Sequence, residues 1–207
     1  MTRAVFLDAL GTLLELEPPW VLLRSKLPDV SEERLQAAVR MEMDYYREHA
    51  HEGRDEASLV DLRERCARLI SDELGVEISA EELVSSVRFD PYPDAEPALR
   101  DLRGRGLKLV VVSNWDCSLG TVLEASGLSR HLDGAVSSAE TGSRKPDPGI
   151  FGSALALAGC APEQALHVGD TPHEDVAGAE AAGVRALLID REGEGDISAL
   201  GQIVQHL

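Results

Sequence analysis

The chain has 207 residues, of which 43% are hydrophobic and 28% are charged, an ordinary globular composition that excludes disordered, collagen-like and low-complexity proteins. Acidic residues outnumber basic ones by 37 to 20, giving a formal net charge of -17. The electrostatic field of such a net charge repels nucleic acids and anionic membrane surfaces, so we expect neither as a partner. The length predicts one domain that carries a sizeable insertion.

The first residues and the cysteines bear on the cellular compartment. The apolar run at residues 4–7 is broken at once by Asp8, so it is too short and too polar for a signal peptide or a membrane span. Cys66, Cys117 and Cys160 are widely spaced and form no CxxC arrangement, which argues against a disulfide framework and a zinc site. We therefore expect a cytoplasmic protein with reduced thiols.

Five short apolar runs predict buried strands. They lie at residues 4–7, 107–112, 135–136, 165–168 and 184–189. Segments of helical length and periodicity lie between the later runs, at residues 93–105, 118–126, 148–158 and 175–182. Strands that alternate with helices predict right-handed βαβ units, and therefore a Rossmann-like, three-layer α/β/α core with a parallel sheet.

The stretch from about residue 15 to residue 87 differs, because it contains no strand-like run and is rich in helix formers. It predicts four helices, at residues 20–27, 31–49, 56–74 and 81–87. The second and third carry an apolar stripe, and Ser79 and Glu82 form a capping box before the fourth. We expect an α-helical cap at residues 15–90, inserted into a core made of residues 1–14 and 91–207. A last short helix is expected at residues 197–207.

Polar residues follow four of the predicted strands. They are Asp8 after the first, Ser113 and Asn114 after the second, Glu140 and then Lys145 after the third, and Asp170 after the fourth. In open parallel sheets, ligands bind beyond the carboxyl ends of the strands. Each residue alone is compatible with a turn or a helix cap, but their joint position at the ends of separate strands favours a functional site.

Four ordered segments resemble the motifs of the haloacid dehalogenase superfamily, and specifically those of its branch with an α-helical cap inserted after the first motif. The segments are residues 6–13 (FLDALGTL), 112–114 (VSN), 144–147 (RKPD) and 168–175 (VGDTPHED). The sequence GAEAAG at residues 178–183 also matches the family's pattern. The resemblance covers nearly the whole chain and implies a hydrolase.

The resemblance also implies a role for each motif residue. Asp8 would attack an electrophilic centre and form a covalent intermediate, which splits one hard displacement into two. Thr12 and Ser113 would donate hydrogen bonds to phosphoryl oxygens, and Asn114 would position the nucleophile or its substrate. Lys145 would neutralise the charge that develops during the reaction.

A magnesium site is implied by the same motifs. Its ligands would be Asp8, the backbone carbonyl of Leu10 and Asp170, with Asp175 acting directly or indirectly. Such an oxygen-only set suits Mg²⁺. Carboxylates gathered so closely are costly without a cation, because like charges disfavour one another's ionisation.

Leu10 departs from the pattern of the family's phosphatases, which carry a second Asp there as general acid and base. Losing such a group costs about 10²- to 10⁴-fold in rate. Asp116, His173 and Glu140 are candidates to replace it. We expect a magnesium-dependent phosphohydrolase that acts on a small, anionic, phosphorylated metabolite through an aspartyl-phosphate on Asp8, either with another proton donor or with a good leaving group such as that of an acyl phosphate.

Three alternatives remain open at this stage. A 2-haloacid dehalogenase would tolerate Leu10, because halide leaves without a proton, and Arg40 could bind the substrate carboxylate. Those enzymes need no metal, however, and they replace the Gly169-Asp170 pair that is present here. A related carbon–phosphorus hydrolase branch needs a cap lysine, and Lys26 does not fit its pattern. The third alternative is a degenerate binding or regulatory protein that has lost turnover.

Overall fold

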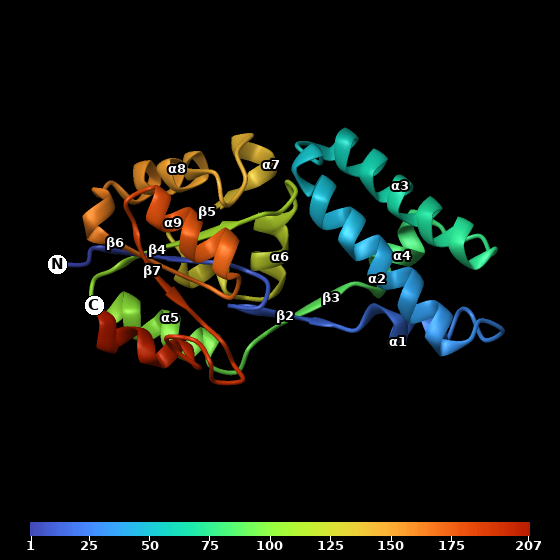
Figure 1. The fold of residues 1–207 in the computed structure, drawn as a ribbon, viewed down its shortest axis with the longest axis horizontal. Coiled ribbons are helices and arrows are strands. Elements are labelled where there is room, and N and C mark those ends of the chain that lie inside the picture. The colour runs from blue at the N-terminus through green and yellow to red at the C-terminus, as the bar shows by residue number, and fades with distance from the viewer.

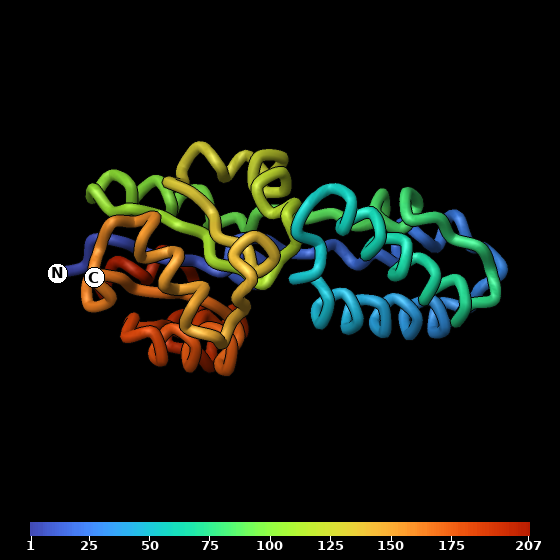
Figure 2. The backbone as a smooth tube through the Cα atoms, turned by 90° about the horizontal axis from the view of Figure 1, so that it is seen from above, coloured from blue at the N-terminus to red at the C-terminus, as the bar shows by residue number.

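The computed structural model describes residues 1–207, which form two lobes (Figures 1 and 2). An α/β lobe contains both ends of the chain, and a group of four helices, the helical lobe, lies beside it. In both views the two ends lie on the side of the α/β lobe that faces away from the helical lobe. None of the helices combines the length and the hydropathy needed to cross a membrane.

A five-stranded parallel sheet forms the centre of the α/β lobe, with the strand order β5-β4-β1-β6-β7. Its strands are β1 (Ala4–Leu7), β4 (Lys108–Ser113), β5 (Gly134–Ser137), β6 (Ala165–Gly169) and β7 (Arg185–Leu188). They coincide with the five predicted strands. The central strand β1 pairs with β4 on one side and with β6 on the other. All four of its residues are buried, which explains why its sequence is apolar throughout and does not alternate.

Helices cover both faces of this sheet, so the predicted Rossmann-like α/β architecture is confirmed. Val5 and Leu7 of β1 pack on one face against α5 (Ala95–Gly104), α6 (Leu119–Ala125) and the C-terminal 3₁₀ helix Leu200–His206. Ala4 and Phe6 pack on the other face against α8 (Pro148–Ala158) and α9 (Gly178–Ala181). The alternation of side chains along β1 therefore supplies both apolar layers.

The helical lobe has an apolar core of its own, separate from the two layers around the sheet. Its helices are α1 (Pro19–Arg24), α2 (Glu32–His49), α3 (Glu56–Leu74) and α4 (Ala80–Ser86). The capping box of Ser79 and Glu82 is confirmed, and Asp55 and Ser58 form another at the start of α3. These boxes satisfy backbone N–H groups that have no partner within the first helical turn.

Two strands that the sequence analysis missed connect the lobes. β2 (Leu14–Glu17) pairs antiparallel with β3 (Arg88–Pro91) to form a two-stranded ribbon. The expectation that the inserted segment carries no strand is therefore wrong at its two ends. Neither strand has a partner nearby in the sequence, so no hairpin turn signals the pairing.

Two predicted helices also differ from the structure. The segment expected to be helical at residues 175–182 begins earlier, as the π-helix Pro172–Ala177, and continues as α9. The last helix is a short 3₁₀ helix, and a further four-residue helix, α7 (Ser138–Thr141), was not predicted. Helices this short carry too little periodicity to be recognised from sequence.

Candidate active site

The polar residues that follow the strands meet beyond the carboxyl edge of the parallel sheet. Asp8 directly follows β1, Ser113 ends β4, and Asp170 directly follows β6. Lys145 comes from the loop between α7 and α8, and Asp175 from the π-helix that follows β6. These side chains converge because β1, β4 and β6 are adjacent and parallel, so their carboxyl ends lie side by side.

The carboxylate of Asp8 is held at one oxygen and free at the other. Its Oδ1 accepts hydrogen bonds from Ser113 Oγ at 3.0 Å and from Lys145 Nζ at 2.6 Å. Its Oδ2 accepts no hydrogen bond, although the residue as a whole is only 6% exposed. Burial raises the pKa of Asp8 to about 7, against the opposing attraction of Lys145. The site thus presents one unengaged carboxylate oxygen from a buried aspartate.

Lys145 links Asp8 to Asp175. Its Nζ lies 2.6 Å from Asp8 Oδ1 and 2.6 Å from Asp175 Oδ1, and the side chain is 2% exposed. Although burial disfavours the ammonium form, the two carboxylates outweigh it and raise the pKa of Lys145. Burial also opposes ionisation of Asp175, but Lys145 and a hydrogen bond from His167 hold the pKa of Asp175 below its usual range. Lys145 and Asp175 are therefore an ion pair.

Asn114 lies behind Lys145 rather than beside the free oxygen of Asp8. Its Oδ1 accepts from the backbone N–H of Lys145 at 2.8 Å, and its Nδ2 donates to the backbone oxygen of the same residue at 3.0 Å. Nδ2 also donates to Glu174 at 3.0 Å. Since its amide is fully engaged, the structure places Asn114 as a support for Lys145, and only through it for the nucleophile.

Thr12 and Leu10 follow Asp8 in the same loop. Thr12 is completely buried, yet its Oγ1 has no hydrogen-bond partner, so this hydroxyl keeps an unused donor. The backbone oxygen of Thr12 accepts from Arg191 at 2.6 Å, which holds the loop in place. Leu10 is half-buried and packs against the apolar layer under the sheet.

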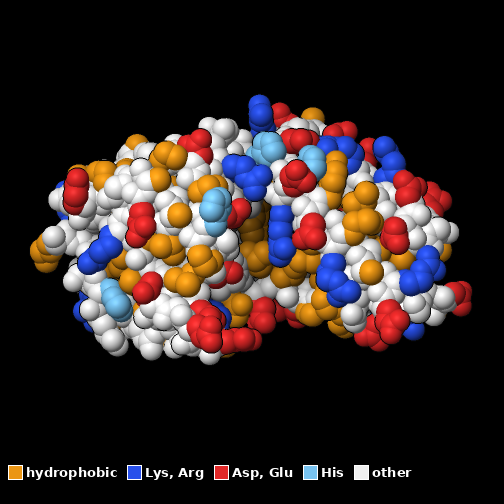
Figure 3. All heavy atoms as spheres, viewed as in Figure 1, with side chains coloured by type: hydrophobic (Ala, Val, Ile, Leu, Met, Phe, Trp, Pro, Cys, Tyr) orange, Lys and Arg blue, Asp and Glu red, His pale blue; other side chains and the backbone are white.

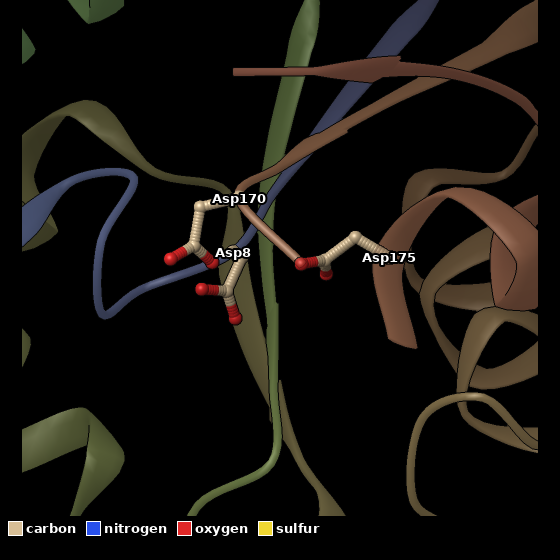
Figure 4. A group of neighbouring side chains, drawn as sticks. All are labelled: Asp8, Asp170 and Asp175. Carbon is tan, nitrogen blue, oxygen red and sulfur yellow. The ribbon is translucent and has the colours of Figure 1, made fainter. Parts of the chain in front are cut away.

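Three carboxylates surround the expected metal position. Oxygens of Asp8, Asp170 and Asp175 lie within 4.8 Å of one another (Figure 4). The chain approaches Asp170 so closely at Gly11 that a Cβ there would lie 2.1 Å from the carboxylate, and Gly11 has φ +85. Only glycine tolerates both conditions. The loop that carries Leu10 is therefore pressed against Asp170.

The charges of this cluster fit a divalent cation. Lys145 is the one lysine or arginine in contact with Asp8 and Asp175, so the three carboxylates, when all are ionised, carry two negative charges that its ammonium does not compensate. Burial and the charge of Asp175 raise the pKa of Asp170. Hard oxygen donors and excess negative charge are what Mg²⁺ requires.

The three carboxylates are not equally free to bind a metal ion. Both oxygens of Asp175 are engaged, Oδ1 by Lys145 and His167, and Oδ2 by the backbone N–H of Thr171 at 3.0 Å. The unengaged oxygens are Oδ2 of Asp8 and Oδ2 of Asp170. The arrangement therefore favours Asp8 and Asp170 as direct ligands and an indirect part for Asp175.

None of the three candidate proton donors makes a hydrogen bond to Asp8. Asp116 is buried, and its two oxygens accept from Ser118 N–H at 2.7 Å and from the hydroxyl of Tyr46 at 2.8 Å. Glu140 and His173 are exposed, and Glu140 accepts a hydrogen bond from Ser137. The structure brings none of the three into hydrogen-bond contact with the nucleophile.

Two residues at the site were missed by sequence reasoning. His167 looked like a member of the apolar run of its strand, although a histidine inside such a run is itself a signal that could have been used. Arg191 donates to Thr12 and lies 3.5 Å from the ring centroid of Tyr92. It comes from the loop after β7, and nothing in its local sequence relates it to the first motif.

The order and spacing of these residues match a known family along most of the chain. A family model described as haloacid dehalogenase-like hydrolase matches residues 2–183. The chain belongs to this family. The resemblance seen in the four motifs is thereby confirmed at the level of the superfamily, and the chain is a haloacid dehalogenase-like hydrolase with its cluster of carboxylates at the expected edge of the sheet.

Curated relatives of this hydrolase include proteins named as phosphatases. It is 41% identical over 137 residues to the phosphoserine phosphatase of Thermus thermophilus, covering 63% of this chain and 55% of that protein. The chain spans about half the length of the curated relatives it matches.

Two solved structures share the fold over nearly their whole length. A HAD phosphatase from Thermococcus onnurineus superposes with a TM-score of 0.71 at 24% identity, covering 99% of this chain and 97% of that chain. The L-2-haloacid dehalogenase of Xanthobacter autotrophicus superposes with a TM-score of 0.74 at 23% identity, covering 99% and 98%. Since both activities occur on this fold, the fold alone does not distinguish them.

Proposed function

We propose that this hydrolase is a magnesium-dependent phosphohydrolase that acts on a small, anionic, phosphorylated metabolite through an aspartyl-phosphate on Asp8. The observation that carries the proposal is the cluster of Asp8, Asp170 and Asp175 with only Lys145 to balance it. A phosphoryl-transfer site uses a cation there, whereas displacement of halide from carbon does not. The similarity to a phosphoserine phosphatase supports the same choice.

The residues divide the chemical work as follows. Lys145 and Ser113 fix the Asp8 carboxylate through Oδ1, so that one of its oxygens can attack phosphorus while the other faces the cation. A bond forms between the attacking oxygen and phosphorus, and the bond from phosphorus to the leaving oxygen breaks, with its electron pair staying on that oxygen. Water then attacks phosphorus, and the bond between phosphorus and the Asp8 oxygen breaks with its electron pair restoring the carboxylate. The protons of the water leave with the released phosphate and solvent. Thr12 Oγ1 and Lys145 Nζ offer donors to the phosphoryl oxygens.

Magnesium would be held by Asp8, Asp170 and the backbone carbonyl of Leu10, and would offset negative charge on the phosphoryl group. Asp175 keeps Lys145 charged and in place through their contact at 2.6 Å. Asn114 fixes the backbone of Lys145 at both its N–H and its carbonyl. These contacts preorganise the cationic side of the pocket before substrate arrives.

Leu10 narrows the class of substrate. It supplies no acid to the leaving oxygen, and Asp116 and Glu140 already accept hydrogen bonds from Tyr46 and Ser137. We therefore propose a substrate whose leaving group departs without protonation, such as an acyl phosphate. The leaving group of an alkyl phosphate ester, if it is not protonated, is a strongly basic alkoxide, so such an ester would react far more slowly.

We also propose that residues 15–90 act as a cap over a core of residues 1–14 and 91–207. The lobes are joined by the β2–β3 ribbon, and Figure 3 shows a cleft between them with hydrophobic side chains inside and Lys or Arg side chains at its edge. Basic groups at the rim would attract an anionic substrate to a protein whose net charge is -17. Opening and closing of the lobes would admit substrate and exclude water.

A 2-haloacid dehalogenase is the second candidate, because Leu10 is harmless when halide leaves. The metal-fitting cluster argues against it, and Arg40, which could bind the substrate carboxylate, is exposed on α2. A binding protein that has lost turnover is the third. It would keep the pocket without releasing product from any substrate.

A parallel screen for released phosphate and released halide separates these functions. Purified protein is incubated with acyl phosphates, phosphate esters and short 2-haloacids, each with Mg²⁺ and with excess chelator. We expect phosphate release from acyl phosphates that requires Mg²⁺. Halide release in chelator would establish the dehalogenase. Absence of both products, together with no rise in melting temperature on adding Mg²⁺ and beryllium fluoride, would overturn the aspartyl-phosphate mechanism.

A further inference from the structure

His167 is a fully buried histidine that the chemistry proposed above does not use. It lies in the middle of the central sheet, on β6, with its side chain 0% exposed. Its Nε2 is 2.9 Å from Asp175 Oδ1, and its ring meets the ring of Phe151 edge-on, with centroids 5.0 Å apart. A polar ring in this position is costly unless its contact with Asp175 compensates.

The contact defines the state of the imidazole. Asp175 is ionised and accepts from Lys145, so the ring atom facing it, Nε2, is the donor. The other ring nitrogen, Nδ1, is a buried atom that makes no hydrogen bond of normal geometry, so the contact with Asp175 is the hydrogen bond through which the ring acts. The ring therefore serves as a donor to one acceptor.

This donor lies at the start of a chain of contacts that ends at the nucleophile. His167 Nε2 and Lys145 Nζ both donate to Asp175 Oδ1, at 2.9 and 2.6 Å, and Lys145 Nζ also donates to Asp8 Oδ1 at 2.6 Å. The backbone of Thr171 holds the other oxygen of Asp175. Without the imidazole, Oδ1 of Asp175 is held by a flexible lysine alone.

We propose that His167 is a positioning residue: it orients the Asp175 carboxylate and thereby holds the Lys145 ammonium against Asp8. The change in kcat that we expect when His167 is replaced rests on the proposed phosphohydrolase function, whereas the expected effect on the Lys145 ammonium does not. Removing a partner of this kind typically costs about 10- to 100-fold in activity or metal affinity.

Two amide substitutions form a matched pair for the test. In His167→Gln the amide nitrogen can reach the position of Nε2, so the donor to Asp175 is kept. In His167→Asn the shorter amide ends near the position of Nδ1, so the donor is lost while a polar group of similar volume stays. Phe151→Leu is the control, because it disturbs the packing around the ring and leaves the donor intact.

The first readout is the side-chain ammonium signal of Lys145 in protein labelled with ¹⁵N-lysine. The chain has only three lysines, and the other two, Lys26 and Lys108, are exposed, so their ammonium protons exchange rapidly. We expect a sharp Lys145 signal in the wild type, His167→Gln and Phe151→Leu, and a broadened or absent signal in His167→Asn. An unchanged signal in His167→Asn would overturn the inference, whatever the protein hydrolyses.

The second readout is kinetic. With acetyl phosphate and Mg²⁺, we expect kcat to fall about 10- to 100-fold in His167→Asn with little change in KM, and to recover largely in His167→Gln. If kcat falls equally in all three variants and the fall follows the decrease in melting temperature, His167 only contributes packing and the inference is wrong. If a variant fails to fold, a ¹⁵N-histidine spectrum of the wild type still decides one step, because protonation at Nδ1 in place of Nε2 contradicts the donor role.

Discussion

Tyr46 of the helical lobe donates a hydrogen bond of 2.8 Å to Asp116 of the α/β lobe, 70 positions away in the chain. Asp116 is buried, and burial raises the pKa of Tyr46, so the phenol stays protonated and remains a donor. Beside it, the backbone N–H of Cys117 donates to Gly53 at 2.8 Å. We call these two contacts, Tyr46–Asp116 and Cys117–Gly53, the latch. The two lobes are therefore held together at the latch as well as at the β2–β3 ribbon.

Tyr46→Phe removes the donor and leaves a buried carboxylate oxygen without a partner. We expect the free energy of unfolding to fall by about 1–3 kcal/mol in urea titrations, and small-angle scattering to show a wider separation of the lobes. Tyr45→Phe is the matched control, because it removes a bond of 2.7 Å to Arg65 inside the helical lobe. Equal scattering profiles for the two variants would contradict the latch.

Gly53→Ala tests the same contact by steric means. An added Cβ would lie 2.9 Å from Cβ of Asp116 and 3.3 Å from Leu59. We expect a loss of about 1–3 kcal/mol in the free energy of unfolding, since the lobes must separate slightly to accept it. Gly152→Ala on α8 meets nothing within 4 Å, so it should be neutral or stabilising. A stabilising Gly53→Ala would show that the lobes are loosely apposed.

Asp8→Asn removes the attacking oxygen and keeps the size of the side chain. We expect phosphate release to fall by at least about 10³-fold, because the covalent route is lost. The circular dichroism spectrum should be unchanged. Activity near the wild-type level in a purified sample would show that Asp8 is not the nucleophile.

Leu10→Asp supplies the proton donor that the first motif lacks. We expect hydrolysis of alkyl phosphate esters to rise by up to about 10²- to 10⁴-fold, and hydrolysis of acetyl phosphate to change little. Leu10→Asn has nearly the same shape without the acid and should not reproduce the gain. A gain in both variants would point to pocket shape, and no gain in either would point to a different donor.

The raised pKa of Asp8, about 7, predicts how Mg²⁺ binding depends on pH. Below that pH the carboxyl group is protonated in the metal-free protein, so the cation must displace a proton. The apparent dissociation constant of Mg²⁺ should therefore increase by up to about tenfold for each pH unit below 7, and level off above it.

Titration calorimetry between about pH 6 and pH 9, in buffers of different ionisation heat, measures both the affinity and the proton released. Ionisation of Asp8 also destabilises the metal-free fold as pH rises through about 7, so added Mg²⁺ should raise the melting temperature more at high pH. A dissociation constant independent of pH would mean that Asp8 is ionised throughout.

The parallel sheet was predictable because its signals are local. Strands β1, β4 and β6 are buried on both faces, so each appears as a mostly apolar run, and a polar residue ends the strand or directly follows it. The ribbon of β2 and β3 was not predictable, because Leu16 pairs with Phe89 far along the chain. β2 and β3 can pair only when the fold of the two lobes brings these segments side by side.

The candidate site, like the fold, was predictable from the sequence only in part. Asp8 and Asp170 were found because each lies in a motif that directly follows a strand, and Lys145 was found because its own motif comes after β5 in the chain. Asn114 was also found, but its contact with the backbone of Lys145 was not, since a spacing shows which residues are near and not which atoms are engaged. Arg191 reaches Thr12 from the loop after β7, a contact made only by the completed fold.

The position of β1 has a consequence for the order of folding during synthesis. Its Ala4 pairs with Lys108 on one side and with Ala165 on the other, so β1 is synthesised before both of its neighbours and gains the second only after β6 has been made. The helical lobe has a separate apolar core and can collapse earlier. Until β6 emerges, the apolar residues of β1 have no second partner and are exposed to chaperones and to aggregation.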